Sequence, residues 1–296
     1  MENTLTNRTL SKRSKDLIYF NCKLSSISQD IIQLFTAQIT DEDKDLHSYE
    51  VKIGEIEKKL GRRLNSLEIF KTLEEELFKP VFEFKNGAVT DKFAWCSKLS
   101  RNDDTKTLTI QMHPELKEHL IALKQNKVSF TIIDTDYFLK LKNAYSKRLY
   151  TIFKYWAGIA ELRQSMFINV SFEINEFIDL LRLSPSLSLY KNMKNRVLLT
   201  AIEEINKFTD IAVALNETKK SNSVNSKVTE LNFIVTNKEF FKKTEKQVNE
   251  KNEDSDNRIN NVDLWQLNSL KSEHEVLDCE VIENNKNIEN SFIFNK

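Results

Sequence analysis

YKNMKNRVLLTAIEEIN (190–206) is the stretch that decides the fold, because its apolar residues repeat with the period of a helix. At about 100° per residue they gather on one broad face, as in a helix packed on a core. This face holds Met193, Val197, Leu198, Ala201, Ile202 and Ile205, joined by Tyr190 and by Phe208. The opposite face holds Asn192, Asn195, Arg196, Leu199, Glu203 and Asn206, with Lys191 beside it. We predict one amphipathic helix whose first turns carry cations, although the helix macrodipole disfavours positive charge there.

Donors and cations at a helix N-terminus suit DNA recognition. In a helix-turn-helix, the second helix enters the major groove with its N-terminal residues at the base edges. Arginine suits guanine and asparagine suits adenine, each through a pair of hydrogen bonds. The candidate DNA contacts in this helix are Lys191, Asn192, Lys194, Asn195 and Arg196, of which Lys194 projects toward the apolar side. The alternative is an ordinary solvated polar face, which most surface helices have.

The segments around this helix follow the order of a winged helix. A long helix is expected from about 135 to 158, followed by the strand MFINVSFEI (166–174), whose apolar residues alternate. Asn175 is the expected N-cap of a short helix, and SPSLS (184–188) is the expected turn. The 190–206 helix is followed by two strands, IAVAL (211–215) and VTELNFIV (228–235). The polar loop between these strands carries Lys219, Lys220 and Lys227, which we interpret as a DNA-binding wing.

The same order of elements occurs earlier in the chain. Gly61 is expected to end a short helix, and Asn65 with Glu68 is typical of the start of the next one. The expected elements begin with a helix at 27–39, the strand YEVKI (49–53) and the helices GEIEKKLG (54–61) and SLEIFKTLEEELF (66–78). A hairpin of VFEF (81–84) with KFAWCSKL (92–99) is expected around Asn86-Gly87. The strand KTLTIQM (106–112) and a helix from His113-Pro114 to about Gln125 follow. The predicted fold class is therefore α+β, with tandem, pseudo-duplicated winged-helix domains.

Length and charge divide the chain into three parts. A chain of 296 residues is long for a single hydrophobic core, so two domains are expected. Residues 1–125 are neutral overall, residues 126–240 carry a net charge of +4, and residues 241–296 carry −4. We predict an N-terminal winged-helix domain at 1–125, a C-terminal one at 126–240 that is the main DNA reader, and a disordered, acidic, Asn-rich tail at 241–296.

Several kinds of chemistry lack their motifs in this sequence. Its four glycines are too scattered for a P-loop or a dinucleotide fingerprint. The three cysteines, Cys22, Cys96 and Cys279, form no CxxC pair and suit a reduced, cytoplasmic protein. His113 and His119 share a helical region at a spacing that is poor for joint metal ligation. No apolar run approaches the ~20 residues of a membrane span. We expect no catalytic residue, metal, cofactor or membrane association.

The segment from about 135 to 235 resembles the replication initiators of iteron-type plasmids, a family with two winged-helix units. The resemblance lies in AYSKRLYTIFKYW (144–156), INVSFEINEFIDLLRL (168–183), YKNMKNRVLLTAIEEINKFTDIAVAL (190–215) and the closing strand VTELNFIV. In the N-terminal half, FAWCSKLSRNDDTKTLTIQMHPELKEHLIALK (93–124) is similar to the family's wing and following helix.

The resemblance implies sequence-specific binding to repeated sites, called iterons, in double-stranded plasmid origin DNA. It also implies local opening of the origin and recruitment of the host initiator and helicase. Family members form homodimers in equilibrium with monomers, with the N-terminal unit at the dimer contact, and the dimers repress their own gene. By residue match, Ser146, Lys147 and Arg148 would contact phosphates.

The N-terminal unit has weaker candidates for DNA contact. Arg62, Arg63 and Lys71 are candidates by position only. The run TLEEELF (72–78) places Glu74, Glu75 and Glu76 in the N-terminal recognition helix, which argues against deep insertion there.

Two other functions remain open on the sequence. A dedicated winged-helix transcriptional repressor would share the DNA-binding face and differ in what it recruits. A nicking rolling-circle initiator would use a tyrosine nucleophile beside a metal held by closely spaced histidines. The sequence has no His-x-His, and we interpret Tyr145, Tyr150 and Tyr155 as core or backbone-contacting residues.

Overall fold

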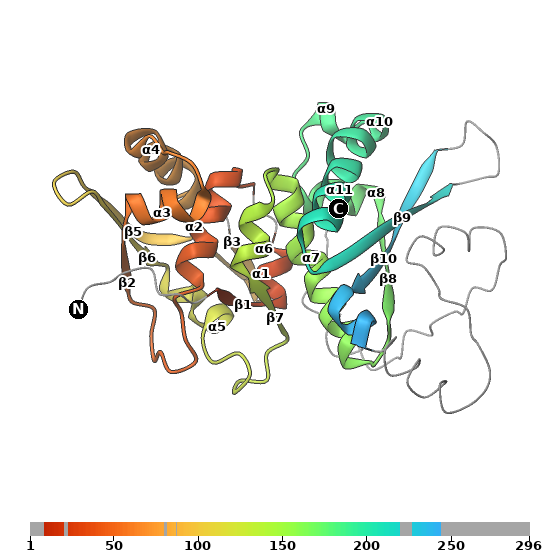
Figure 1. Ribbon diagram of the computed structural model, residues 1–296, viewed down its shortest axis with the longest axis horizontal. Helices are drawn as coiled ribbons and strands as arrows, with labels where there is room; N and C mark the ends of the chain where they lie inside the picture. The colour runs from red at the N-terminus through yellow and green to blue at the C-terminus, as the bar shows by residue number, and fades with distance from the viewer. Residues whose placement is uncertain (1–8, 21–22, 80–81, 87, 220–226, 244–296) are drawn as a thin grey trace. The chain divides into compact units, whose positions relative to one another are not determined.

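The computed structural model describes residues 9–20, 23–79, 82–86, 88–219 and 227–243 (Figure 1). The described residues up to Glu83 form one compact unit with Asp91–Lys242, and the hairpin residues 84–90 fall outside it. From residue 244 onward, the acidic tail lies outside the described residues, as do its apolar patches. The disorder of the tail therefore stays a prediction.

The first winged-helix order is present between Ser26 and Met112. Its elements are the helix α2 (Ser26–Thr36), the strand β2 (Ser48–Lys52), the helices α3 (Ile53–Leu60) and α4 (Ser66–Leu77), and the strands β5 (Cys96–Asn102) and β6 (Thr107–Met112). The strands form an antiparallel sheet in the order β2-β6-β5, in which Ile110 lies opposite both Tyr49 and Leu99. The alternation predicted for the last strand is confirmed, because Leu108, Ile110 and Met112 are buried.

Local sequence signals account for the turn between α3 and α4. Gly61 ends α3 with a φ of 64°, a left-handed conformation that glycine adopts without the steric cost of a Cβ atom. The side chain of Asn65 accepts hydrogen bonds from the backbone N–H groups of Leu67 and Glu68, and so caps α4. Both predicted positions are confirmed.

Two parts of the N-terminal half differ from the prediction. The strands β3 (Phe82–Asn86) and β4 (Val89–Phe93) form a separate two-stranded sheet, so the segment 92–99 is divided between β4 and β5. The helix expected up to Gln125 is a 3-10 turn, η1 (Pro114–Leu116), followed by α5 (Lys117–Leu120). It ends early because Ile121 takes an extended conformation, with φ −112° and ψ 143°, and Ala122 follows with a φ of 52°, which also lies outside the α-helical region.

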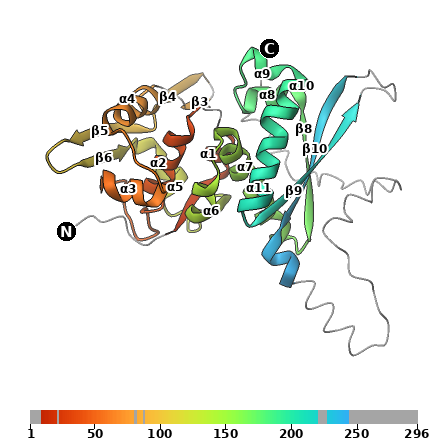
Figure 2. The same ribbon diagram turned by 45° about the horizontal axis from the view of Figure 1, so that its top comes forward.

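The second winged-helix order occupies the C-terminal half (Figures 1 and 2). Its elements are the helices α6 (Thr135–Lys140) and α7 (Ala144–Leu162), the strand β8 (Phe167–Glu173), the helices α8 (Ile174–Leu180) and α9 (Pro185–Ser188), the helical stretch Tyr190–Phe208, and the strands β9 (Ile211–Lys219) and β10 (Val228–Asn237). The antiparallel sheet has the order β8-β10-β9, with Phe233 opposite Val170 and Leu215. The predicted tandem winged-helix architecture is confirmed.

Three local predictions in this half are corrected. The single helix expected from about 135 to 158 is broken between α6 and α7, where the side chain of Asn143 caps α7 by accepting from the N–H of Tyr145 at 2.8 Å. Asn175 is not an N-cap, because α8 begins at Ile174, two residues earlier than expected, and Glu173 takes the cap position. The expected turn 184–188 contains the short helix α9, which begins at Pro185, where the missing N–H is tolerated.

A small sheet joins segments from the two halves of the chain. The strand β1 (Leu10–Ser14), which precedes α1 (Lys15–Tyr19), pairs antiparallel with β7 (Phe130–Asp134). Residues on both sides of the expected domain boundary at 125/126 therefore share a sheet. The boundary itself stays a prediction.

The core of the C-terminal half fixes the position of the helical stretch 190–208. The rings of Phe153 and Phe177 lie 4.8 Å and 5.7 Å from the ring of Phe233, and all three side chains are fully buried. These residues come from α7, α8 and β10, so one aromatic cluster holds two helices on the sheet. The helix α11 (Leu199–Phe208) packs in turn on α7 and on β9, as Figure 2 shows.

Candidate nucleic-acid interface

The helical stretch Tyr190–Phe208 is anchored by one apolar side. Its residues Met193, Val197, Leu198, Ala201 and Ile205 are all 0% exposed. They belong to the same buried cluster as the residues of α7, β9 and β10. The amphipathic pattern predicted this burial, and the other side of the stretch is left at the protein surface.

A π-helical turn interrupts this stretch. The turn, η2 (Lys194–Leu198), lies between α10 (Tyr190–Met193) and α11. The backbone N–H of Leu199 donates to the carbonyl of Lys194, five residues back, and the Thr200 hydroxyl donates to the carbonyl of Asn195 at 3.3 Å. The prediction of one regular α-helix is thus corrected at this turn. Such π-helical turns are rare in proteins, and those that occur are often found at functional sites.

The outward side of the stretch presents polar groups that no other part of the described chain engages. Lys191, Asn195 and Arg196 are exposed. Across the described ranges, no hydrogen bond or ion pair involves the side chains of these three residues. They offer the donor groups that pair with guanine, with adenine and with phosphate. The positive charges of Lys191 and Arg196 lie near a helix start, where the macrodipole disfavours them, and a bound polyanion would offset this cost.

Two of the predicted contacts in this stretch have partners inside the protein. The Asn192 side chain donates to the carbonyl of Ser186 at 2.7 Å, which ties the helix start to α9. The Lys194 ammonium lies 2.5 Å from the carboxylate of Glu217 on β9. Burial raises the pKa of Glu217, but the hydrogen bond and the positive charge of Lys194 outweigh burial and hold this pKa below its usual value. Lys194 therefore links the recognition helix to the wing.

The C-terminal half of the stretch is tied to its neighbours by polar side chains. The Glu204 carboxylate accepts from the backbone N–H groups of Lys142 at 3.0 Å and Asn143 at 3.3 Å, where α7 begins. The Asn206 side chain donates to the carbonyl of Val213 at 2.9 Å and accepts from its N–H at 2.7 Å. Glu203, by contrast, is exposed. The adjacent glutamates thus differ in role: Glu204 braces α7, and Glu203 faces solvent.

The wing is formed by the ends of β9 and β10. Lys219, at the end of β9, and Lys227, just before β10, are both exposed. Lys220 lies outside the described residues. The strand pairing shifts register between Val228 and Glu230, and such irregularities increase the local twist of a hairpin. The two described lysines remain candidates for phosphate contact.

The phosphate contacts predicted on α7 are contradicted for two of three residues. Ser146 and Lys147 are 0% and 1% exposed, so neither can reach DNA in this conformation. The Lys147 ammonium instead pairs with the carboxylate of Asp30 and donates to the hydroxyl of Ser26 at 2.8 Å, both on α2. The sequence could not show this, because the partners lie more than a hundred residues away.

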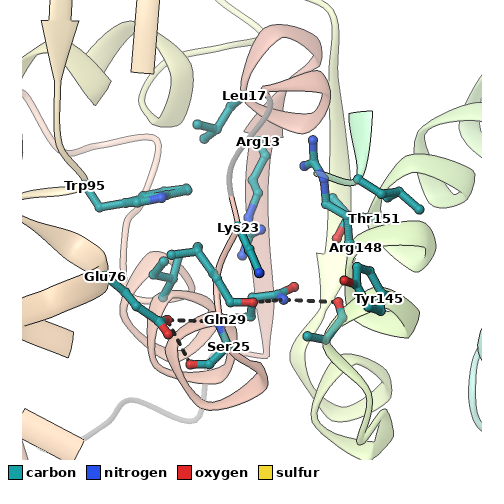
Figure 3. A pocket seen from close by; sticks show the side chains of 14 residues that line it. Arg13, Leu17, Lys23, Ser25, Gln29, Glu76, Trp95, Tyr145, Arg148 and Thr151 are labelled. Atoms are coloured by element: carbon teal, nitrogen blue, oxygen red, sulfur yellow. Dashed lines mark hydrogen bonds between the residues drawn. The ribbon is translucent and has the colours of Figure 1, made fainter. Parts of the chain in front are cut away.

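Arg148 lies on the same helix but lines a cavity of about 340 Å³ (Figure 3). Its guanidinium donates to the carbonyl of Phe20. In Figure 3, Trp95 and Arg148 approach the cavity from opposite sides, with Arg13 and Lys23 between them. The resemblance named Arg148 as a surface phosphate contact, but the structure places it in this partly enclosed position.

The N-terminal candidates are exposed but lie among acidic residues. Arg62, Arg63 and Lys71 are exposed, as are Glu74 and Glu75 on α4. Their role in DNA contact stays a prediction. The third glutamate of this run has a different function: the Glu76 carboxylate accepts from the backbone N–H and the hydroxyl of Ser25, each at 2.8 Å, at the start of α2.

The side chains of His113, His119 and Cys96, which could bind a metal or act as a nucleophile, are either hydrogen-bonded within the protein or buried. The His113 side chain accepts from the N–H of Glu115 and caps η1, and His119 lies 2.9 Å from the Ser14 hydroxyl. Burial raises the pKa of the Cys96 thiol to about 12, which keeps it protonated and unreactive. The described residues hold no group of three or more metal-binding side chains. In the same ranges, no helix has the length and apolar character required to cross a membrane.

Two family models match the chain. The model described as Initiator Replication protein, WH1, matches residues 10–154, and the model described as Initiator Rep protein, WH2, matches residues 173–235. Together they cover more than half of the sequence. The chain belongs to the initiator replication protein family. Both recognition helices described above lie within the matched ranges.

Among solved structures, this initiator is similar to the Pi initiator protein in a crystal structure with iteron DNA. The two are 16% identical, and the superposition has a TM-score of 0.61 and covers 78% of this chain and 98% of the other. At this identity the similarity establishes the fold alone. No curated protein matches the sequence.

Proposed function

We propose that this initiator binds repeated sites at a plasmid origin, and that the C-terminal winged helix reads their sequence. The observation that carries the proposal is the outward side of Tyr190–Phe208, where Asn195 and Arg196 are exposed and the rest of the described chain leaves both side chains unengaged. The Pi initiator protein, which shares the fold, was crystallised with iteron DNA. The chain's membership of the initiator replication protein family supports the same class of target.

The proposal gives different tasks to the residues of this surface. Arg196 and Asn195 lie at the start of the recognition helix, where base edges are read in winged-helix and helix-turn-helix proteins. Lys191 at the helix start and Lys219 and Lys227 on the wing would contact phosphates, which position the protein without reading sequence. Lys194 would act indirectly, by holding the helix against the wing.

Family resemblance supports further steps after binding. The bound initiator would open nearby DNA and recruit the host initiator and helicase. Homodimers in equilibrium with monomers would repress the gene for the initiator itself. We propose that none of these steps uses an active site, a metal or a cofactor of the chain, and that the protein acts in the cytoplasm.

The experiment that tests the proposal uses the purified full chain and the plasmid that encodes it. Bound restriction fragments are selected and footprinted, and supercoiled plasmid is probed with permanganate for unpaired thymines. We expect protection of tandem repeats of about 20 base pairs, since two winged helices reach two successive major grooves. Permanganate reactivity should then appear beside the repeats only when the initiator is bound.

Two other outcomes would replace this function with a different one. Protection of a single inverted repeat near a promoter, without permanganate reactivity, would identify a dedicated repressor. Metal-dependent nicking of supercoiled plasmid with a covalent tyrosine adduct would identify a nicking initiator. Failure to protect any fragment selectively would overturn the DNA-reading role altogether.

A further inference from the structure

One side chain on the outward side of the recognition helix does not fit phosphate contact or hydrogen bonding. Within Tyr190–Phe208, which is described throughout, Leu199 is the one large apolar residue that is exposed, at 45%. Its sequence neighbour Leu198 is 0% exposed. The contrast shows that Leu199 is not part of the core, although its residue type would suit the core.

The π turn sets the position of Leu199. The residue begins α11, and its backbone N–H closes the turn on the carbonyl of Lys194. Asn195 and Arg196 precede it by about one turn, and Glu203 follows it by about one turn, all on the exposed side. A protein that inserts Arg196 into the major groove therefore carries the Leu199 side chain in with it.

The major groove offers one apolar group to such a side chain, the C5 methyl of thymine. We propose that Leu199 reads a thymine methyl in the bound repeat, an inference that rests on the proposed function. The three residues from Arg196 to Leu199 span about 4.5 Å along a helix, and successive bases of one strand are about 3.4 Å apart. The thymine therefore lies one or two base pairs from the base that Arg196 reads.

Isolated exposed apolar residues are common on protein surfaces and often have no role. Leu162, at the end of α7, is more exposed than Leu199, at 81%, and lies outside the recognition helix. It is the matched control, because Leu162→Ala makes the same chemical change on the same fold. If Leu199 reads a thymine methyl, only the Leu199→Ala variant should lose its sensitivity to that methyl group.

The test replaces thymines of the footprinted repeat, one at a time, by deoxyuridine. This change removes the methyl group and keeps every hydrogen-bonding group of the base. Affinities are measured for the wild-type chain, Leu199→Ala and Leu162→Ala. We expect one deoxyuridine position that weakens wild-type binding by about 4-fold, the value of one buried methyl group. The same deoxyuridine substitution should weaken binding by Leu162→Ala by the same factor. Leu199→Ala should bind the thymine-containing and the deoxyuridine-containing duplex equally well.

The outcomes separate the inference from the function on which it rests. If Leu199→Ala keeps the full wild-type sensitivity to deoxyuridine, or if no thymine near the Arg196 base is sensitive, the reading by Leu199 is wrong while iteron binding stands. If the wild-type chain shows no preference for any repeat over random DNA, the proposed function fails, and the inference fails with it. Circular dichroism of both variants checks that they are folded.

Discussion

Lys147 and Asp30 form a buried ion pair that joins α7 to α2, with the two side chains 1% and 4% exposed. Burial lowers the pKa of Lys147, and burial raises the pKa of Asp30 to about 6 against the attraction of Lys147. Each buried charge is therefore stabilised by the other, and either one alone would be unfavourable in this site. This relationship fixes the long helix on which the C-terminal core and the recognition helix are packed.

Lys147→Met should strongly destabilise the protein near neutral pH. The substitution leaves the Asp30 carboxylate buried without its counter-charge, which typically costs about 3–5 kcal/mol. The folded pKa of Asp30 already lies above its ordinary value of 3.8, and losing the lysine raises it further. Stabilisation from protonated Asp30 is fully present below the ordinary pKa and is lost as the pH rises through the folded pKa. The loss of stability should therefore be smaller at about pH 5 than at about pH 7.5, as measured by urea unfolding.

The double variant Asp30→Leu with Lys147→Met is the control for this pair. Replacing both charges by apolar groups removes the unpaired carboxylate, so most of the lost stability should return and its pH dependence should disappear. A single-variant loss of the same size at both pH values would show that the ion pair is not what holds α7 to α2.

Replacing the adjacent residues Glu204 and Glu203 by alanine should have different effects on the stability of the protein. Glu204→Ala leaves two N–H groups at the start of α7 without their acceptor and should lower the unfolding free energy by about 1 kcal/mol. Glu203→Ala should change stability by no more than about 0.5 kcal/mol, because this residue is exposed. It should also raise DNA affinity modestly, since it removes a negative charge from the side that we propose to face DNA. Similar stability losses in the two variants would contradict these assignments.

Asn206 and Asn195 offer a second matched pair, one structural and one for recognition. Asn206→Ala removes both hydrogen bonds to the backbone of Val213 and should cost about 1–3 kcal/mol of stability. Asn195→Ala should leave the melting temperature nearly unchanged and weaken binding to the cognate repeat. Thermal melts and binding isotherms on the same preparations decide the matter. A destabilised Asn195→Ala would mean that its side chain is engaged within the protein.

The salt dependence of binding should distinguish Lys191 from Lys194. A lysine that contacts a phosphate contributes about one unit to the slope of log affinity against log salt concentration. Lys191 is exposed and should show this loss in Lys191→Ala. Lys194 is paired with Glu217, so Lys194→Ala should weaken binding through the wing without changing the slope. A unit loss of slope in Lys194→Ala would show that it leaves Glu217 to contact DNA.

The sequence predicted the architecture because the relevant signals are local. Gly61, Asn65 and the alternating residues of β6 each act within a few positions along the chain, and the duplicated order of elements reinforced them. The outward side of the recognition helix was predictable for the same reason, since burial on one side follows from helical period.

What the sequence did not show depends on contacts across long distances. Lys147 looks like a surface cation in a basic helix, and only its position opposite Asp30 reveals that it is buried. The role of Glu204 depends likewise on the distant start of α7. The π turn at Lys194–Leu198 was not predicted, because one additional residue in a turn leaves the apolar side continuous. Arg196 is exposed and has no internal partner within the described ranges, as the helical period of the sequence indicates.

The central claim is that the start of the C-terminal recognition helix reads bases, and Arg196→Ala tests it most directly. Affinities of the wild-type and variant chains are compared on the footprinted repeat, on repeats with single base-pair changes, and on random duplex of equal length. The account predicts a loss of about 1–3 kcal/mol on the cognate repeat and relaxed preference at one base pair, with little change on random DNA. An equal loss on cognate and random DNA, or no loss on either, would contradict it.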